Sequence, residues 1–525
     1  MLFTDPVFLF LFLPIVAAIF YWVAPRFGAS GAFIVLILAS MVFYSPWGLQ
    51  NSLLLFASFT VNFIVSYWLL KLPGANSWPR WLLHFFGQIY NFGTLFWFKY
   101  SAFFGHIFTG GASGGQFSLV SVAVPIGISF YTFQQAMFLL ETYRRDPHVI
   151  VYMGKLEGAV NTLRAYLRYT VFVVFFPHLV IGPIVYLDEF QPQVDSKQFG
   201  LFKRSNMEVG LVFLALGLFK KVVLADNLAP IVETIFSTSE RGIHISMIAA
   251  WMGAIGYYAQ LYFDFSGYAD MALGTARMFG VRYPMNFYSP LKAVGIIDYY
   301  RRWHISLTRV ISRFLYAPLS TEGTRYALRN KLSWVPKQFL SVWLPLAINF
   351  EIIALWHGAR WTFILFGVIH GLWYITETQI RQTKRFKKFA RESSPTLRAW
   401  AGRAILFVPM VATFALFRST TIPSFGHFLG ELFSGDIHGI VPVSIRRSGA
   451  IIAASFAVIW LLPNSVEFLR RYRPAIATYD NAMYGWRMFL VAWRPTWIWS
   501  IIVAAMMLAA LYYIGRQPPF LYMGF

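Results

Sequence analysis

Long apolar runs recur along almost the whole chain, and they constrain its fold more than any other feature. A transmembrane α-helix needs about 20 predominantly apolar residues. The candidate membrane elements are 7–24, 31–44, 51–70, 81–104, 120–140, 169–187, 208–224, 246–263, 341–356, 361–375, 404–417, 448–462 and 496–514. Some of these runs are short or broken by Gly and Pro, which favours re-entrant elements beside complete spans. We therefore expect an all-α integral membrane protein with roughly 11–13 membrane elements.

The composition excludes an ordinary soluble domain and all cysteine chemistry. Of the 525 residues, 58% are hydrophobic and only 13% are charged, whereas a soluble domain carries about 25% charged residues. The chain has no cysteine, which rules out disulfides, a thiol nucleophile and cysteine-ligated zinc or iron–sulfur clusters. No HExxH zinc pattern and no nucleotide-binding glycine pattern is present. We expect no metal and no nucleic-acid partner.

The basic residues predict a topology. The net charge is +22, and cytoplasmic loops of membrane proteins carry an excess of Lys and Arg. The loop at 45–51 is neutral, the loop at 71–80 is basic, and 109–115 again contains no Lys or Arg. This alternation predicts an N-terminus and a 109–115 loop outside the cytoplasm. The basic stretch 381–403 marks a cytoplasmic loop, which would attract anionic lipids or, alternatively, a polyanionic donor such as a coenzyme A ester.

The central part of the chain, 264–340, is the least hydrophobic. It combines charged and aromatic residues with several Pro and Gly residues, a pattern that argues against one continuous span. Irregular backbone at membrane depth is tolerated where it is buried in protein or lines a wet cavity. We expect short tilted or re-entrant helices around a polar chamber here. A second amphiphilic insert at 463–495 is typical of an interfacial helical pair.

His357 is the first candidate catalytic residue, because it ends the strongly apolar segment 341–355. An ionisable group at membrane depth is costly and marks a functional site by default. Desolvation favours neutral imidazole, which is suited to act as a general base on an acceptor hydroxyl or thiol. The alternative is a structural histidine that is hydrogen-bonded within the helix bundle.

His304 is the second candidate, and it lies among cations. Arg301 and Arg302 precede it in the run YYRRWH. On a helix, Arg301 and His304 would share one face because they are three residues apart. One interpretation is an interfacial basic helix. The other is a site in which His304 polarises the carbonyl of an acyl donor while Arg301 and Arg302 hold its phosphates.

The remaining ionisable residues favour structural roles. Asp264 and Asp270 are six residues apart, which does not place them on one helix face, so we expect ion pairs with nearby arginines. His370 follows His357 by 13 residues, a spacing that is not a zinc signature. The other histidines are interpreted as structural: His84, His106, His148, His178, His244, His427 and His438.

Six stretches, in order along the chain, resemble the membrane-bound O-acyltransferase family, and above all its bacterial polysaccharide branch. They are PIGISFYTFQ (125–134), FFPHLVIGPI (175–184), GLFKKVVLADNL (217–228), YFDFSGYAD (262–270), RRWHISL (301–307) and LWHGARW (355–361). Each is modest alone, and the ordered set is specific. The resemblance covers most of residues 1–375, the predicted membrane core, and leaves 376–525 as a basic loop with C-terminal helices of the same domain.

The resemblance implies a helical bundle with a central tunnel, which the donor enters from the cytoplasm and the acceptor from the opposite face. In that family pattern His357 matches the catalytic histidine, and His304 matches the second active-site polar position. The implied donor is acetyl-CoA. The implied acceptor system is a periplasmic or membrane-anchored acetyltransferase partner that decorates an exopolysaccharide similar to alginate or cellulose. The expected location is the bacterial inner membrane, in contact with its lipids.

Two alternatives to this function stay open. A D-alanyl transferase would take its acyl group from a carrier-protein thioester and deliver it to a cell-envelope acceptor. A transporter would use the histidines as a proton relay, although no inverted repeat is visible. The glycan also stays open, because Arg313 stands where the alginate branch carries a carboxylate.

Overall fold

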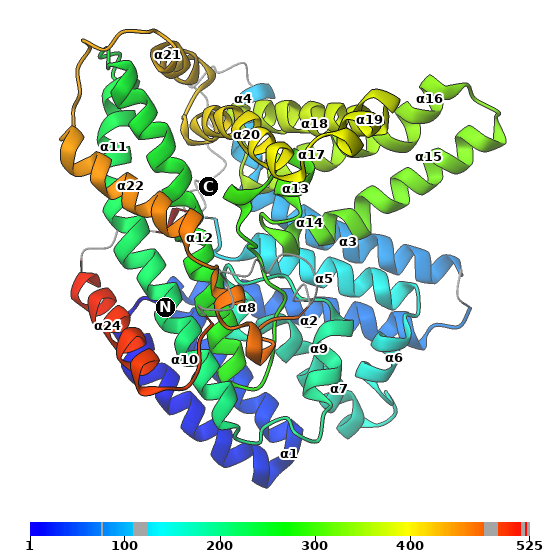
Figure 1. The fold of residues 1–525 in the computed structure, drawn as a ribbon. Helices are drawn as coiled ribbons and strands as arrows, with labels where there is room; N and C mark the ends of the chain where they lie inside the picture. The colour runs from blue at the N-terminus through cyan, green and yellow to red at the C-terminus, as the bar shows by residue number, and fades with distance from the viewer. Residues whose placement is uncertain (75–76, 109–123, 477–491, 516–519, 522–525) are drawn as a thin grey trace. The chain divides into compact units, whose positions relative to one another are not determined.

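The computed structural model describes residues 1–74, 77–108, 124–476, 492–515 and 520–521. Helices follow one another through these ranges, which contain no β-strand (Figure 1). The predicted all-α class is confirmed. The predicted outer loop at 109–115, and the part of the 463–495 insert at 477–491, lie outside the described residues.

Four helical runs within the described ranges are long and apolar enough to cross a membrane. They are Phe8–Trp47, Leu49–Lys71, Trp334–His357 and Pro395–Arg418, and the shorter Trp497–Tyr513 is also apolar. Many of their exposed side chains are large and hydrophobic, for example Trp22, Leu38 and Ile405. A helix that is apolar on its outer face is suited to lipid rather than water. The chain is therefore a multi-pass membrane protein.

The first of these runs is broken in its middle. Helix α1 (Leu13–Tyr44) contains Pro25, and Gly28 has a φ of 66° and a ψ of −163°, outside the helical region. Glycine adopts such positive φ values without the steric penalty of other residues. The break separates two helical halves, which correspond to the predicted elements 7–24 and 31–44.

The chain forms two compact units. The first comprises residues 1–218, 268–285 and 465–514. Its elements are η1 (Phe8–Phe12), α1, η2 (Ser45–Trp47), α2 (Leu49–Lys71), α3 (Trp78–Lys99), α4 (Ser101–Phe108), α5 (Ile128–Tyr143), α6 (Pro147–Met153), α7 (Ala159–Val174), α8 (Phe176–Leu179), α9 (Leu187–Val194), α10 (Arg204–Leu218), α23 (Ser465–Phe468), η7 (Arg470–Tyr472) and α24 (Trp497–Tyr513). Aromatic rings fill its core: Phe43 lies 5.8 Å from Phe8 and 5.6 Å from Phe176, measured between ring centroids. Such contacts add to the burial of the rings themselves.

The second unit comprises residues 219–267, 286–464 and 515–525. Helix α12 (Met247–Met278) begins in this unit and ends in the first. The other elements are η3 (Phe219–Ala225), α11 (Asp226–Glu240), η4 (Pro290–Lys292), α13 (Ile296–Tyr300), α14 (Ile305–Ile311), η5 (Ser312–Tyr316), α15 (Ala317–Arg329), α16 (Trp334–Gln338), η6 (Phe339–Trp343), α17 (Leu344–His357), α18 (Trp361–Gln382), α19 (Lys384–Glu392), α20 (Pro395–Arg418), α21 (Ile422–Leu432) and α22 (Ile445–Leu461). The division at residue 375 stays a prediction.

Within the second unit, α18 contacts three other helices that contribute to the candidate site. It packs against α17, α20 and α13, and Figure 1 shows α17 and α18 side by side. Helix α13 has five residues and α14 has seven. The expectation of short helices in the central part of the chain is confirmed.

Candidate active site

His304 occupies a strained position between two short helices. It is the residue before α14 and has a φ of 45° and a ψ of 52°, in the left-handed region. That conformation costs a non-glycine residue roughly 1–2 kcal/mol. Asn286 holds it: its backbone carbonyl accepts from Ile305 N–H at 3.0 Å, and its Oδ1 accepts from Ser306 N–H at 3.2 Å. Backbone strain held in place by its surroundings is typical of functional sites.

His357 is the last residue of α17, at the end of the membrane-crossing run Trp334–His357. Its side chain is buried, with 8% of the residue exposed. The imidazole packs edge-on against Phe417 of α20, with 5.1 Å between the ring centroids. A rigid helix end and an aromatic neighbour thus fix its position.

The two predicted catalytic histidines, 53 positions apart in the sequence, line one cavity of about 30 Å³. The rest of the wall comes from Leu261, Phe265, Tyr299, Tyr300, Trp303, Leu307, Thr308, Ile353, Phe366, Phe414 and Phe417. The expectation of a polar chamber is wrong here, because this wall is mainly aromatic and aliphatic. The volume is far below the roughly 300 Å³ of an ordinary ligand pocket, so the wall must move to admit a donor.

Helical spacing explains how these residues converge. Leu261 and Phe265 are four residues apart on α12, and Phe414 and Phe417 are three apart on α20, so each pair shares one helix face. Phe265 contacts His304 edge-on at 4.8 Å between ring centroids. The sequence pattern encodes each face, whereas the meeting of the faces is a tertiary feature.

Arg301 and Arg302 lie in the link between α13 and α14, not on one helix with His304. The prediction that Arg301 and His304 share a helix face is therefore wrong, because the helix ends at Tyr300 and restarts at Ile305. Arg302 is buried, and its Nε donates to Asp298 Oδ1 at 2.8 Å. Arg301 is exposed.

Asp264 forms an ion pair, as expected in kind but not in partner. Its Oδ1 lies 2.7 Å from Lys221 Nζ, which also lies 2.6 Å from Asp226 Oδ1. The predicted arginine partner is wrong for Asp264. All three side chains are less than 10% exposed. In the first unit, Asp270 accepts a hydrogen bond from the Ser465 hydroxyl.

Two neighbours of the cavity were not anticipated from the sequence. Leu521 N–H donates to Asp264 Oδ2 at 3.1 Å, and the Phe520 ring lies 6.4 Å from that of Phe265, so the C-terminal residues reach the cavity wall. His370 Nδ1 lies 2.8 Å from the hydroxyl oxygen of Tyr300. The contacts of Phe520 and Leu521 were missed because these residues are apolar and carry no functional signal. The Tyr300–His370 contact was missed because the two residues are 70 positions apart.

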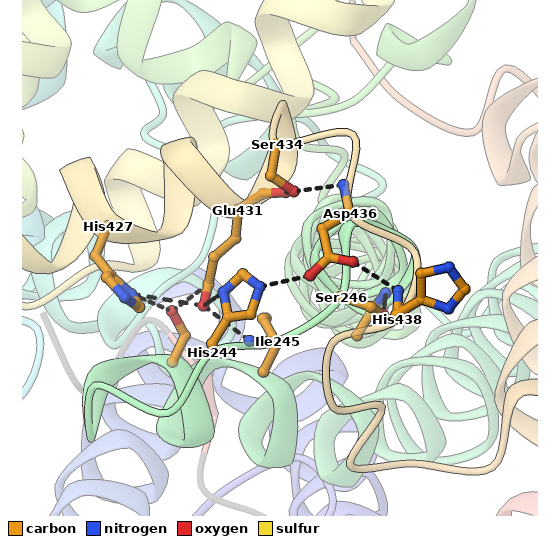
Figure 2. Close-up of polar contacts among 10 residues, drawn as sticks. His244, Ile245, Ser246, His427, Glu431, Ser434, Asp436 and His438 are labelled. Atoms are coloured by element: carbon orange, nitrogen blue, oxygen red, sulfur yellow. Dashed lines mark hydrogen bonds and ion pairs between the residues drawn. The ribbon is translucent and has the colours of Figure 1, made fainter.

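A separate polar cluster joins the link between α11 and α12 to α21 and the segment after it (Figure 2). His244 Nε2 lies 2.7 Å from Asp436 Oδ2, and Glu431 Oε1 lies 3.9 Å from His244 Nδ1 and 3.6 Å from His427 Nδ1. Hydrogen bonds from the His244 side chain and the His438 backbone N–H lower the pKa of the Asp436 carboxyl. In the described part of the chain, no group of His, Asp and Glu residues is arranged to hold a metal ion.

The structural interpretation of the other histidines stays a prediction, and the contacts of His178 fit it. His178, in the first unit, lies 2.7 Å through Nδ1 from the Tyr283 hydroxyl and 3.0 Å through Nε2 from the Phe172 carbonyl oxygen. Both ring nitrogens are thus satisfied. The side chain of His106 lies outside the described residues.

The cavity can support proton transfer combined with carbonyl activation. Two imidazoles line one small space, His304 from the residue before α14 and His357 from the end of α17. One can accept a proton while the other donates a hydrogen bond, which are the two functions that acyl transfer requires. Aromatic walls exclude water and strengthen both interactions.

Residues 129–417 match the family model described as MBOAT, membrane-bound O-acyltransferase family. This segment contains His304, His357 and every other residue that lines the cavity.

Curated relatives extend the match. A peptidoglycan O-acetyltransferase of Helicobacter pylori is 36% identical over 391 residues, 71% of this chain and 69% of the relative. A probable alginate O-acetylase AlgI of Pseudomonas syringae is 33% identical over 445 residues, 83% of this chain and 76% of the relative. A teichoic acid D-alanyltransferase of Streptococcus thermophilus is 28% identical over 268 residues, 50% of this chain and 59% of the relative.

Proposed function

This chain belongs to the membrane-bound O-acyltransferase family, and we propose that it transfers acetyl groups from cytoplasmic acetyl-CoA across the bacterial inner membrane for O-acetylation of an exopolysaccharide. It is an acyltransferase. The acetyl donor, the direction of transfer and the glycan are the proposed parts. The relatives named for O-acetylation of peptidoglycan and alginate support an acetyl group as cargo and a glycan as acceptor.

One observation carries the proposed mechanism: His304 and His357 line the same buried cavity. The acceptor hydroxyl oxygen attacks the carbonyl carbon of the thioester while His357 takes the hydroxyl proton. His304 orients the thioester and polarises its carbonyl. A carbon–oxygen bond forms, the carbon–sulfur bond breaks, and the leaving thiolate takes the proton back from His357.

Arg301 and Arg302 have different roles in this proposal. Arg301 is exposed and available for the phosphates of coenzyme A. Arg302 was proposed for the same task, but its guanidinium is engaged by Asp298. Arg302 therefore contributes to donor binding indirectly. Its ion pair with Asp298 fixes the link between α13 and α14, which contains Arg301.

The decisive experiment is acyl transfer in proteoliposomes that carry the purified protein. Radiolabelled acetyl-CoA is supplied on the cytoplasmic side, and wild type is compared with His357→Ala. We expect His357→Ala to lose transfer by about 10²-fold or more, because general-base catalysis contributes about 10²–10⁴-fold. Loss of label from the thioester is the measurement.

His438→Ala is the matched control, because His438 is exposed and lies outside the cavity. It should transfer acetyl like wild type. Full activity of a folded His357→Ala protein contradicts the base assignment. Wild-type activity that appears only after a co-purified periplasmic protein is added identifies the proposed acetyltransferase partner as essential.

A D-alanyl transferase is the second candidate, favoured by the match to teichoic acid D-alanyltransferases over half of the chain. The same proteoliposomes distinguish the two by donor. Turnover of a D-alanyl carrier-protein thioester without turnover of acetyl-CoA would replace the acetyl proposal and leave the histidine roles intact.

A further inference from the structure

The hydrogen bond between Tyr300 and His370 joins a residue that lines the cavity to one that does not. Tyr300 lines the cavity, and His370 of α18 does not. His370 is fully buried, and its ring stacks on Phe366, four residues earlier on the same helix, with 3.9 Å between centroids. Phe366 is itself part of the cavity wall. The His370 imidazole therefore packs against the wall residue Phe366, and its Nδ1 lies 2.8 Å from the Tyr300 hydroxyl oxygen.

The Tyr300–His370 pair has one more hydrogen-bond donor than its shared hydrogen bond uses. Neutral imidazole carries one N–H, and tyrosine carries one O–H. Among the described residues, the Tyr300 hydroxyl has His370 as its only hydrogen-bond partner, and His370 Nε2 has none. One shared hydrogen bond uses one of the two donors. The second donor stays unused and buried, which costs free energy.

The position of the unused donor depends on the tautomer of His370. If the tyrosine donates to Nδ1, the spare proton sits on Nε2 of His370, a residue that does not line the cavity. If Nδ1–H donates to the tyrosine oxygen, the spare proton is the tyrosine O–H, on a residue that lines the cavity. An acceptor oxygen bound in the cavity can satisfy only this second arrangement. Such a ligand therefore shifts the pair toward it.

We propose that Tyr300 is a further catalytic residue, whose hydroxyl donates a hydrogen bond to the carbonyl oxygen of the bound acyl group, and that His370 is the residue that positions it. The inference rests on the proposed acyl transfer and adds the group that stabilises its developing oxyanion. As the acceptor oxygen bonds to the carbonyl carbon, negative charge grows on the carbonyl oxygen. A hydrogen-bond donor there stabilises the transition state more than the ground state, because the negative charge on the carbonyl oxygen is larger in the transition state. Proton transfer through His357 is unchanged.

The test uses the full-length protein with acetyl-CoA in proteoliposomes. Tyr300→Phe removes only the hydroxyl, and we expect kcat to fall by about 10²–10³-fold, the cost of losing one oxyanion donor, with little change in KM. His370→Phe keeps the stacked ring and loses the nitrogen, and it should lower kcat in the same way. His370→Asn supplies an N–H near the position of Nδ1 and should recover much of the loss.

Tyr257→Phe is the matched control. Tyr257 is a fully buried tyrosine of α12, outside the cavity lining, and its hydroxyl has no hydrogen-bond partner among the described residues. The kcat and KM of Tyr257→Phe should equal those of wild type. Infrared spectroscopy of bound acetyl-CoA with a ¹³C-labelled carbonyl gives a second readout. The carbonyl stretch should lie at higher frequency in Tyr300→Phe than in wild type, since the hydrogen bond is lost.

O-acetyl content of envelope glycans in cells that depend on this chain separates the two levels of the proposal. If wild type and His357→Ala give equal acetylation, the proposed function fails, and this inference fails with it. If they differ and Tyr300→Phe equals wild type, only the role of Tyr300 is overturned. Equal losses in His370→Phe and His370→Asn, without a carbonyl shift, would reduce His370 to a packing residue.

Discussion

At the scale of single residues, position 304 has two separate requirements: an imidazole for the proposed chemistry and a residue that tolerates the left-handed backbone conformation. Asparagine tolerates positive φ, whereas a β-branched residue does not. The backbone of the two following residues is tied to Asn286, so a substitution at position 304 has to accept the same φ and ψ.

We predict that His304→Asn folds nearly as well as wild type but transfers acyl groups poorly. His304→Val should be less stable than His304→Asn by about 1–2 kcal/mol, the cost of the left-handed conformation. Thermal unfolding in detergent measures the first difference, and acetyl-CoA turnover measures the loss of the imidazole. Equal stabilities of the Asn and Val variants would show that the backbone relaxes away from φ 45°.

Lys221 neutralises two buried carboxylates, Asp226 and Asp264. We predict that Lys221→Met destabilises the protein by about 3–5 kcal/mol, because it leaves uncompensated buried charge. Arg325→Met is the control: it breaks the pair with Glu322, whose side chains are 70% and 67% exposed, and should cost less than about 1 kcal/mol. Unfolding midpoints in the same detergent test both, and similar midpoints for the two variants would contradict the prediction.

At the scale of elements, the polar cluster in Figure 2 fastens the segment between α21 and α22 to the start of α12. Besides the side-chain contacts of His244 and Asp436, Met247 N–H donates to the Asp436 carbonyl oxygen at 2.7 Å. His438 and Glu431 also contribute to the cluster. The side-chain part of this fastening depends on the ionised form of Asp436.

This dependence predicts how the segment responds to acid. The pKa of Asp436 lies below its ordinary value of 3.8 in the folded state. Its ionised form therefore stabilises the segment fully above that value, and the stabilisation is lost as pH falls through the lowered pKa. Hydrogen exchange of residues 433–444 should accelerate in that range, beyond the intrinsic pH effect. Asp436→Asn should show fast exchange at neutral pH and no further acid transition.

The sequence specifies elements better than their meeting points. Apolar runs located the membrane-crossing helices, and apolar character at 341–355 singled out His357, because both signals are local. The helix inferred through Arg301 and His304 was wrong, since a break after Tyr300 leaves no composition signal. The partnership of Asp264 with Lys221 and of Tyr300 with His370 joins residues 43 and 70 positions apart, and periodicity carries no information over that distance.

At the scale of the whole molecule, the absence of native cysteine makes the predicted topology directly testable. We predict that Gln50→Cys reacts with a membrane-impermeant maleimide in intact spheroplasts. Lys388→Cys, in the basic helix α19, should react only after permeabilisation, because positive loops stay in the cytoplasm. Both side chains are exposed. Labelling of Lys388→Cys in intact spheroplasts would invert the assignment of the 381–403 stretch.

The small aromatic cavity affects how many acyl donors are consumed for each acyl group that reaches the glycan. A thioester held beside a general base is as open to water as to a sugar hydroxyl, and each hydrolysed donor wastes an activated acyl group. A space of about 30 Å³ walled by rings such as Phe414 and Phe417 leaves little room for a competing water once the acyl group has entered. The tightness of this wall would therefore set the yield of glycan modification per donor consumed, and a looser one would turn a transferase into a thioesterase.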